Sequence, residues 1–304
     1  MDNQKKDFKS GFVSLLGRTN VGKSTFLNAI LNKKVSIVTP KIQTTRNQIR
    51  GILNDTNKQI IFVDTPGIHK SEHELGKNMN SSSLQSLKSS DIILFFAPLN
   101  EHIGESDNFL LKILKEKKIP TILLLTKSDL VNNKIILEKI SEWKNRYEFN
   151  EIIPISSDHK ESLQKVIVAL EKILPEGVKY YPDDTYSDQP EKFLIREIIR
   201  EKIIMLTKEE VPYSVGVMVE SQEDLPEENT IIISASIIVE RKSQKIILVG
   251  KNGNMIKKIT YQSRKELSNL LNTKIILNLF VKVEEKWRNK SSVLKKLGYN
   301  KESY

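Results

Sequence analysis

A glycine-rich octapeptide, Gly17-Arg-Thr-Asn-Val-Gly-Lys-Ser24, most constrains what this chain can fold into. It follows an apolar run at residues 12–16 and precedes a stretch with helical periodicity, the context in which the pattern G-x-x-x-x-G-K-S binds phosphate. The glycines let the backbone curl so that successive N–H groups and the positive end of the helix dipole face phosphate oxygens. We expect Lys23 to reach the β and γ phosphates and the Ser24 hydroxyl to bind Mg2+. The motif alone does not distinguish ATP from GTP.

Short apolar runs alternate with amphipathic stretches from residue 12 to about residue 174, a pattern typical of strands and helices in a parallel sheet. The turn residues Asp55-Thr-Asn57 predict an antiparallel hairpin between the second and third strands. The fold class is therefore an α/β P-loop domain with a doubly wound, mostly parallel sheet. The predicted strands are 12–16, 48–53, 60–63, 91–97, 121–125 and 151–155, and the predicted helices are 23–32, 106–117, 134–146 and 161–174.

Thr126-Lys-Ser-Asp129 follows an apolar strand and points to guanine. The Asp129 carboxylate can accept hydrogen bonds from the guanine N1–H and exocyclic amine, a pairing that adenine does not offer, while the Lys127 stem covers the ring. The usual motif begins with Asn, so with Thr126 we expect retained guanine choice and weaker affinity. In Ile155-Ser-Ser157, backbone amides are placed to meet the guanine O6.

Two further segments are placed to sense the γ phosphate. Asp64-Thr-Pro-Gly67 closes the third strand, where Asp64 can hold Mg2+ through water and Gly67 can offer its N–H. Gln43-Thr-Thr-Arg46 lies between the first helix and second strand, and its threonines are candidate Mg2+ ligands, with Thr45 favoured over Thr44. The predicted metal ligands are Ser24, Thr45 and Asp64.

Together these segments resemble the G motifs of the translation-factor-related GTPases. Ile68 stands where Ras-like enzymes carry a water-orienting glutamine, so hydrolysis is expected to be slow or assisted. Asn20 resembles the residue with which a subset of such GTPases holds K+, and the expected cofactors are Mg2+ and K+. The candidate nucleotide-binding residues are Gly17, Arg18, Thr19, Asn20, Val21, Gly22, Lys23, Ser24, Thr25, Asp64, Thr65, Pro66, Gly67, Ile68, Thr126, Lys127, Ser128, Asp129, Ser156 and Ser157, with switch I at Gln43, Thr44, Thr45 and Arg46.

Basic charge is concentrated at the C-terminal end of the chain. The formal net charge is +10, with +12 in residues 241–304 and −9 in residues 181–240. Such a balance favours a polyanionic partner for the last segment. The acidic stretch is interpreted as a solvated spacer, with an internal mimic of RNA as the alternative. The absence of cysteine excludes disulfides and thiolate zinc sites, and the lack of a long apolar segment places the protein in the cytoplasm.

The basic segment contains a Gly-x-x-Gly loop entering a helix, Gly250-Lys-Asn-Gly253. Paired glycines permit close approach of a sugar-phosphate backbone. We predict RNA contacts at Gly250, Lys251, Asn252, Gly253, Lys257 and Lys258. The predicted surrounding elements are helix 193–206, strands 213–219, 231–240 and 245–249, a helix to about 271, strand 274–283 and helix 291–297. This order resembles an α+β type II KH domain, and the expected division is a GTPase domain at 1–176, a linker at 177–190 and a KH domain at 191–304.

A P-loop GTPase domain joined to a C-terminal KH domain resembles the Era family of bacterial GTPases, over nearly the whole chain. The resemblance includes Arg196-Glu-Ile-Ile-Arg-Glu-Lys202, Val211-Pro-Tyr-Ser214 and Phe280-Val-Lys-Val283. It implies a magnesium-dependent enzyme that converts GTP to GDP and phosphate. It also implies binding of ribosomal RNA near the 3′ end in the small subunit, and a role in 30S biogenesis. A monomer and peripheral contact with the inner membrane are further expectations.

The alternative is a GTP-gated regulator at the inner membrane whose basic C-terminal domain binds anionic lipid. A lipid surface requires charge but no loop for close approach. The Gly250–Gly253 loop therefore favours RNA.

Overall fold

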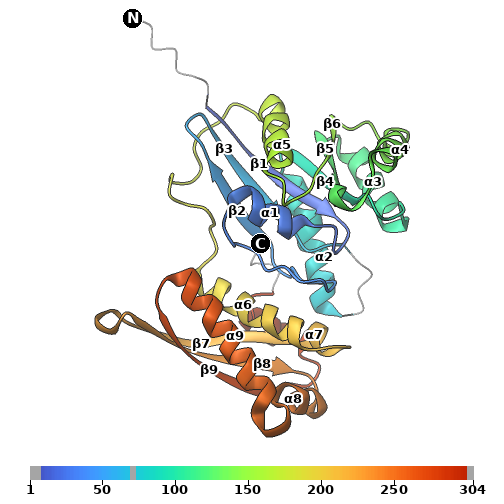
Figure 1. Ribbon diagram of the computed structural model, residues 1–304. Coiled ribbons are helices and arrows are strands. Elements are labelled where there is room, and N and C mark those ends of the chain that lie inside the picture. The colour runs from blue at the N-terminus through green and yellow to red at the C-terminus, as the bar shows by residue number, and fades with distance from the viewer. Residues whose placement is uncertain (1–7, 69–72, 300–304) are drawn as a thin grey trace, which may run out of the picture. The chain divides into compact units, whose positions relative to one another are not determined.

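The computed structural model describes residues 8–68 and 73–299, and these divide into two compact units (Figure 1). The first unit contains residues 8–36, 45–68 and 79–188. The second contains residues 37–44, 73–78 and 189–299. Two short segments of the N-terminal half, one of them leading into switch I, therefore pack with the C-terminal elements.

The first unit is built on a six-stranded sheet with strand order β2-β3-β1-β4-β5-β6. Only β2 is antiparallel, and it pairs with β3 as the predicted hairpin. Because the other strands run parallel, their carboxyl ends meet at one edge, where the loops carrying the sequence motifs follow. The strands are β1 Lys9–Gly17, β2 Ile49–Asn54, β3 Lys58–Asp64, β4 Ile92–Pro98, β5 Thr121–Thr126 and β6 Glu151–Pro154.

Helices cover both faces of this sheet. On one face, α3 and α4 pack buried Leu110 and Trp143 against Phe95. On the other, Phe26 of α1 makes edge-to-face contacts with Phe62 and Phe96. The helices are α1 Lys23–Leu31, α2 Glu74–Ser86, α3 Glu105–Lys117, α4 Asn133–Lys144 and α5 Lys160–Ile173. The sequence did not predict α2, because its Asn and Ser residues are poor helix formers.

The polar segment that follows α5 is held along the edge of the sheet. The Ile52 N–H on β2 donates to the Tyr186 carbonyl at 2.9 Å, and the Gln59 side chain accepts the Tyr181 N–H at 3.0 Å. These bonds cover a strand edge that would otherwise expose unpaired backbone groups. The connection up to Asp188 thus belongs to the first unit.

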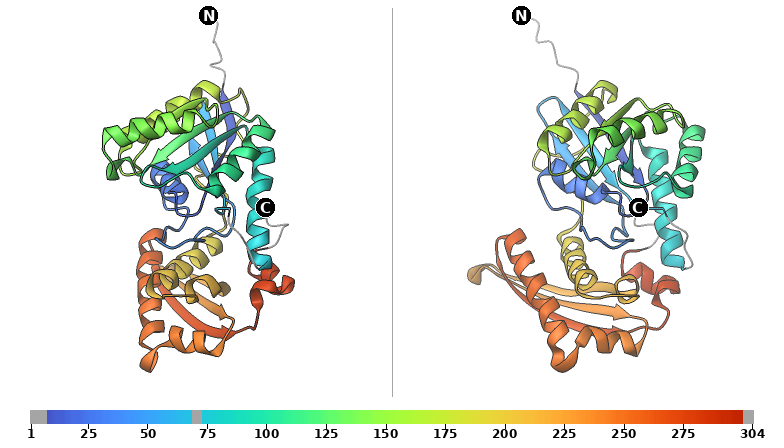
Figure 2. Two further views of the ribbon diagram at one scale, coloured as in Figure 1. Left: turned by 90° about the vertical axis from the view of Figure 1, so that its right-hand side faces the viewer. Right: turned by 45° about the vertical axis from the view of Figure 1, so that its right-hand side comes forward.

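The second unit has a three-stranded sheet of order β7-β8-β9, with β7 Gly216–Leu225 antiparallel to β8 Thr230–Val239 and β9 Lys274–Val283 parallel to β8. Helices α6, α8 and α9 contribute Ile199, Leu248 and Ile259 to a core shared with alternate residues of the sheet. The elements of this unit are coloured yellow to red in Figure 2. The helices are α6 Glu191–Leu206, α7 Val211–Ser214, α8 Lys242–Val249, α9 Asn254–Leu271 and α10 Ser291–Lys296. Among the described residues, no helix combines the length and apolarity needed to cross a membrane.

The predicted strand at 245–249 is wrong, because these residues form the second half of α8. The run Lys245-Ile-Ile-Leu-Val249 is rich in β-branched residues, which favour strands. The preceding residues decide otherwise, since the buried Gln244 side chain accepts the N–H groups of Glu240 and Arg241 at 2.9 and 3.0 Å and caps the helix. The Gly-x-x-Gly loop consequently joins α8 to α9. The mostly parallel sheet of the first unit and the α+β element order of the second agree with the two fold classes predicted from the sequence.

Candidate functional site

The phosphate loop is shaped by a left-handed glycine and by close packing of a second loop. Gly22 has φ of 97° and serves as the N-cap of α1, so the loop turns directly into the helix N-terminus. Gly67, after β3, lies so close that a Cβ there would stand 2.6 Å from the Thr19 nitrogen. Only glycine allows the two predicted phosphate-binding loops to touch.

Lys23 is buried inside this loop. Its ammonium donates to the carbonyls of Arg18 at 2.7 Å and Gly17 at 3.1 Å. Burial lowers the pKa of Lys23 to about 8, while the charge of Asp64 acts in the opposite direction. The loop backbone thus fixes the position of the Lys23 ammonium.

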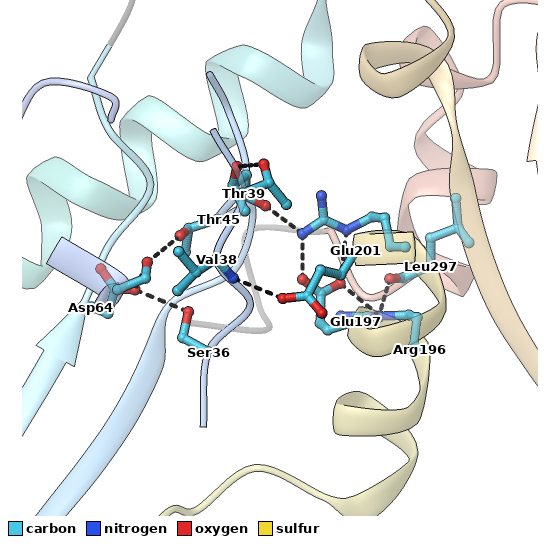
Figure 3. A network of polar contacts seen from close by, with 12 residues as sticks. Ser36, Val38, Thr39, Thr45, Asp64, Arg196, Glu197, Glu201 and Leu297 are labelled. Atoms are coloured by element: carbon cyan, nitrogen blue, oxygen red, sulfur yellow. Dashed lines mark hydrogen bonds and ion pairs between the residues drawn. The ribbon is translucent and has the colours of Figure 1, made fainter. Parts of the chain in front are cut away.

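Three oxygen-bearing side chains converge at the start of α1. The Ser24 hydroxyl lies 2.6 Å from Asp64 Oδ2 and 2.8 Å from Thr45 Oγ1. Asp64 also accepts the Ser36 hydroxyl at 3.2 Å (Figure 3), a residue that sequence reasoning missed. Burial raises the pKa of Asp64, while Lys23 and the two serine hydroxyls oppose that rise.

This oxygen cluster fits a magnesium ion. Asp64 Oδ1 is buried and has no hydrogen-bond partner among residues 8–68 and 73–299, so one carboxylate oxygen is left for a cation to satisfy. The other donors are neutral hydroxyls, and hard oxygen ligands of this kind are those that Mg2+ prefers. The structure places the Thr45 hydroxyl in the cluster, whereas the Thr44 hydroxyl bonds the Lys41 carbonyl at 2.7 Å.

The segment 37–44 leading to Thr45 is held by α6 within the second unit. The Val38 N–H donates to Glu201 Oε1 at 3.1 Å (Figure 3), and the Thr44 carbonyl accepts a bond from Arg200. Arg200 is fully buried and pairs with Glu197, with Nε 3.0 Å from Oε1. In the sequence, these charged residues interrupt the apolar periodicity of the helix, which marks them as unusual. The sequence does not show that segment 37–44 is the part of the chain that they bond.

The predicted guanine motif is tied to the phosphate loop by its unusual first residue. The buried Thr126 hydroxyl donates to the Val21 carbonyl at 2.9 Å. The Ser128 N–H donates to the Ile155 carbonyl at 3.1 Å, which links this motif to the predicted O6-binding segment. Asp129 is exposed, and Lys127 adopts a left-handed backbone conformation with φ of 60°.

The remaining predicted residues lie nearby in the same unit, with the exception of Gln43. Asn20 is exposed with φ of 64°, Ile68 packs against the core around Phe95, and Arg46 is buried. Gln43 has φ of 58° and lies within the segment held by α6. Thr65, Pro66 and Ser156 are buried, and Thr25 and Ser157 are half-buried.

The Gly250–Gly253 loop presents its backbone to solvent at the N-terminus of α9. Gly250, Asn252 and Gly253 have φ of 72°, 54° and 74°, so the loop follows a path that L side chains rarely adopt. Lys251, Asn252, Lys257 and Lys258 are exposed around it. Backbone N–H groups, a helix N-terminus and lysines together favour a phosphate chain.

An apolar recess of about 470 Å³ lies directly beside this loop. It lies between α8 and the end of β9, and Ile246, which is 71% exposed, contributes to its lining. The recess is lined by Lys242, Lys245, Ile246, Val249, Gly250 and Val283. An apolar recess flanked by lysines suits a nucleobase attached to a phosphate backbone.

Two family models match the two units. The first, described as a 50S ribosome-binding GTPase, matches residues 12–127. The second, described as a KH domain, matches residues 210–288.

Two solved structures resemble the chain along almost its entire length. One is a point variant of Era from Aquifex aeolicus bound to GDP and AlF4−. The other is Era in complex with MgGDPNP and nucleotides 1506–1542 of 16S ribosomal RNA. Each is 37% identical with a TM-score of 0.93, covering 96% of this chain and 99% of the other.

Proposed function

Because the chain belongs to the Era family of GTPases with a C-terminal KH domain, we propose that it is a GTP-hydrolysing switch that binds small-subunit ribosomal RNA near its 3′ end and assists 30S biogenesis. The observation that carries this proposal is the pairing, in one chain, of a preformed phosphate and magnesium cradle with a Gly-x-x-Gly loop beside an apolar recess. The family model named for the 50S subunit spans only the GTPase half, whereas the Era likeness spans both units.

The nucleotide-binding chemistry follows from the residues already described. Lys23 carries positive charge to the β and γ phosphates, and the loop N–H groups neutralise the remaining oxygens. Ser24, Thr45 and Asp64 would hold Mg2+, which supplies charge to the β and γ phosphate oxygens. Asp129 selects guanine, and the Thr126 hydroxyl fixes that motif against the Val21 carbonyl of the phosphate loop.

Hydrolysis in this protein is slow without help. Ile68 has no group that can orient a water, and its side chain packs against the core around Phe95. We assign assistance to a K+ ion held with Asn20, whose left-handed backbone lies in the phosphate loop. Turnover in K+ should exceed turnover in Na+, and Asn20→Ala should abolish the difference. Equal rates in the two salts would exclude this role.

Coupling between nucleotide and RNA runs through segment 37–44. Its two ends are bonded by Glu201 and Arg200 of α6, the first helix of the KH unit, and Thr45 of the magnesium cluster is the next residue along the chain. A change at Thr45 is therefore transmitted by the covalent chain to a segment that α6 holds.

The test is binding and hydrolysis by the full-length protein. GTP and GDP should bind far more tightly than ATP and ADP, and a synthetic RNA of the 16S 3′ end should change the hydrolysis rate. Loss of preference for guanine over adenine would overturn the GTPase assignment, and the absence of RNA binding would overturn the RNA assignment.

The partners in this proposal are GTP, GDP, ribosomal RNA and the 30S subunit, with the protein acting as a monomer in the cytoplasm. The membrane alternative is separated from RNA binding by Gly250→Asp combined with Gly253→Asp. RNA binding should be lost in this variant, whereas a lipid contact based on charge would partly survive. No feature of the described residues favours the membrane alternative or the expected peripheral membrane contact.

A further inference from the structure

Two cations of the nucleotide site contact carboxylates that none of the sequence motifs includes, one on the loop between β4 and α3 and one in the first turn of α3. Arg18 of the phosphate loop places Nε 2.9 Å from Asp107 Oδ1 and Nη2 3.2 Å from Glu101 Oε2. Lys127 of the guanine motif places Nζ 3.4 Å from Glu101 Oε1. Glu101 therefore lies between two cations that are far apart in sequence but serve the same ligand.

The loop is fixed at both ends. At its start, the Leu99 N–H donates to the Thr126 carbonyl at 3.0 Å, so the loop is attached to the guanine motif by backbone as well. At its end, the side chain of Asp107 is fully buried, and its Oδ2 accepts the Gly104 N–H at 2.8 Å as part of the N-terminal cap of α3. Both carboxylate oxygens of Asp107 are thus engaged, one by α3 and one by Arg18.

The position of Arg18 also matters to Lys23. The Arg18 carbonyl is one of the two acceptors that hold the Lys23 ammonium, at 2.7 Å. A bond to the Arg18 side chain therefore restrains the same residue whose backbone positions the phosphate-binding cation. On the other side, Glu101 restrains Lys127, whose stem is expected to cover the guanine ring.

We propose that Glu101 and Asp107 are positioning residues that fix the phosphate loop and the guanine motif relative to one another, so that a bound guanine nucleotide is released slowly. Asp107 acts through Arg18, and Glu101 acts through Arg18 and Lys127. In this role each carboxylate acts only through the cation that it bonds. This role rests on the proposed GTPase function and concerns nucleotide release, not the chemical step.

The experiment measures release of a fluorescent GDP analogue from the full-length protein with Mg2+ present. Glu101→Gln keeps the shape and removes the charge, and because Glu101 is 40% exposed, release should accelerate about two- to fivefold. Asp107→Asn removes a buried charge that bonds Arg18, so release should accelerate on the order of tenfold or more. Glu105→Gln is the matched control, since Glu105 lies in the same first turn of α3 and carries the same charge.

Two readouts separate positioning from a general loss of stability. Single-turnover hydrolysis at saturating GTP should change much less than release in Glu101→Gln, because Asp107 still holds Arg18, and through it Lys23, in this variant. Added salt should accelerate release from the wild type more than from Glu101→Gln, since salt screens an exposed ion pair that the variant lacks. In a Lys127→Ala background, Glu101→Gln should have a smaller effect than in the wild type.

The outcomes that overturn the proposal are also defined. Wild-type release rates in both carboxylate variants would exclude it, as would an equal acceleration in Glu105→Gln or a full additive effect in the Lys127→Ala background. If Asp107→Asn fails to fold, the surface variant Glu101→Gln alone decides. A wild-type protein that binds no GDP analogue would instead refute the proposed GTPase function.

Discussion

The proposed nucleotide site and the proposed RNA surface of this protein are built on opposite principles. In the nucleotide site, Lys23, Thr45 and Asp64 are each no more than 9% exposed and bond neighbouring groups of the protein. On the proposed RNA surface, Lys257 and Lys258 are exposed around the Gly250–Gly253 loop. One site is a closed arrangement of buried charges, and the other is an open surface.

This difference predicts how each site responds to substitution. Buried charged groups have no water to replace a lost partner, so the removal of one of them is costly and specific. Exposed lysines contribute mainly through counterion release, which is distributed and sensitive to salt. The nucleotide site should therefore show a few large effects and the RNA surface many small ones.

The largest expected effect is an exception to this comparison, because it comes from an exposed residue of the nucleotide site. Asp129 is exposed, yet Asp129→Asn should reduce GTP affinity by roughly 10³-fold or more, because one of the two oxygens that accept from the base becomes an NH2 donor facing a guanine donor in a desolvated site. Xanthosine triphosphate, which offers the complementary pattern, should restore binding. Exposed Asp158 provides the matched control, so Asp158→Asn should bind GTP normally in an equilibrium titration. Normal GTP affinity in Asp129→Asn would remove the guanine assignment.

The second effect compares the two glycines of the RNA loop. A Cβ on Gly250 would stand 2.7 Å from Met255 Cβ, whereas the nearest atom to a Cβ on Gly253 is 3.9 Å away, and both have positive φ. Gly253→Ala should cost about 1–2 kcal/mol in the free energy of unfolding, and Gly250→Ala should cost more. Denaturant unfolding measures both, and RNA titration should show the same order. Equal losses would show that crowding at Met255 is relieved by small movements.

The sequence predicted elements well where the determinants are local. The bounds of β9 and the start of α1 were correct, because an apolar alternation and a Gly-Lys-Ser pattern each specify their own structure. The prediction failed for α8, where the buried Gln244 cap outweighed the strand preference of the isoleucines that follow. The local propensity of residues 245–249 carries no information about this cap, in which Gln244 bonds the backbone N–H groups of Glu240 and Arg241.

Some residues of the nucleotide site could not be predicted from the sequence, because they too depend on contacts between distant parts of the chain. Ser24, Thr45 and Asp64 belong to motifs with fixed spacing, so their convergence followed from the fold class. Ser36 and Asp107 belong to no motif, and only the three-dimensional path of the chain brings them to Asp64 and Arg18. Motif spacing thus predicts the groups that contact the ligand, but not the groups that hold them.

A third effect concerns a buried hydrogen bond of the nucleotide site. Thr126→Val keeps the shape of the side chain but leaves the Val21 carbonyl without its 2.9 Å donor. An unsatisfied buried acceptor costs about 1–3 kcal/mol, so both unfolding free energy and GDP affinity should fall. Thr126→Ser retains the hydroxyl and is the control. An unchanged Thr126→Val protein would mean that water replaces the donor, and the site would be less closed than the comparison assumes.

The smallest effects belong to the lysines around the RNA loop, and their salt dependence is more informative than their size. Lys257→Ala and Lys258→Ala should each weaken RNA binding only a few-fold, because each removes one exposed phosphate contact among several. Each should also reduce the slope of log affinity against log salt by about 0.7, the value for one contact with a single strand. Exposed Lys112 on α3 is the matched control, and Lys112→Ala should change neither quantity. If one of the loop lysines caused a loss of 100-fold with an unchanged slope, it would be acting as a specific buried contact in the complex, and the open description of this surface would have to be abandoned.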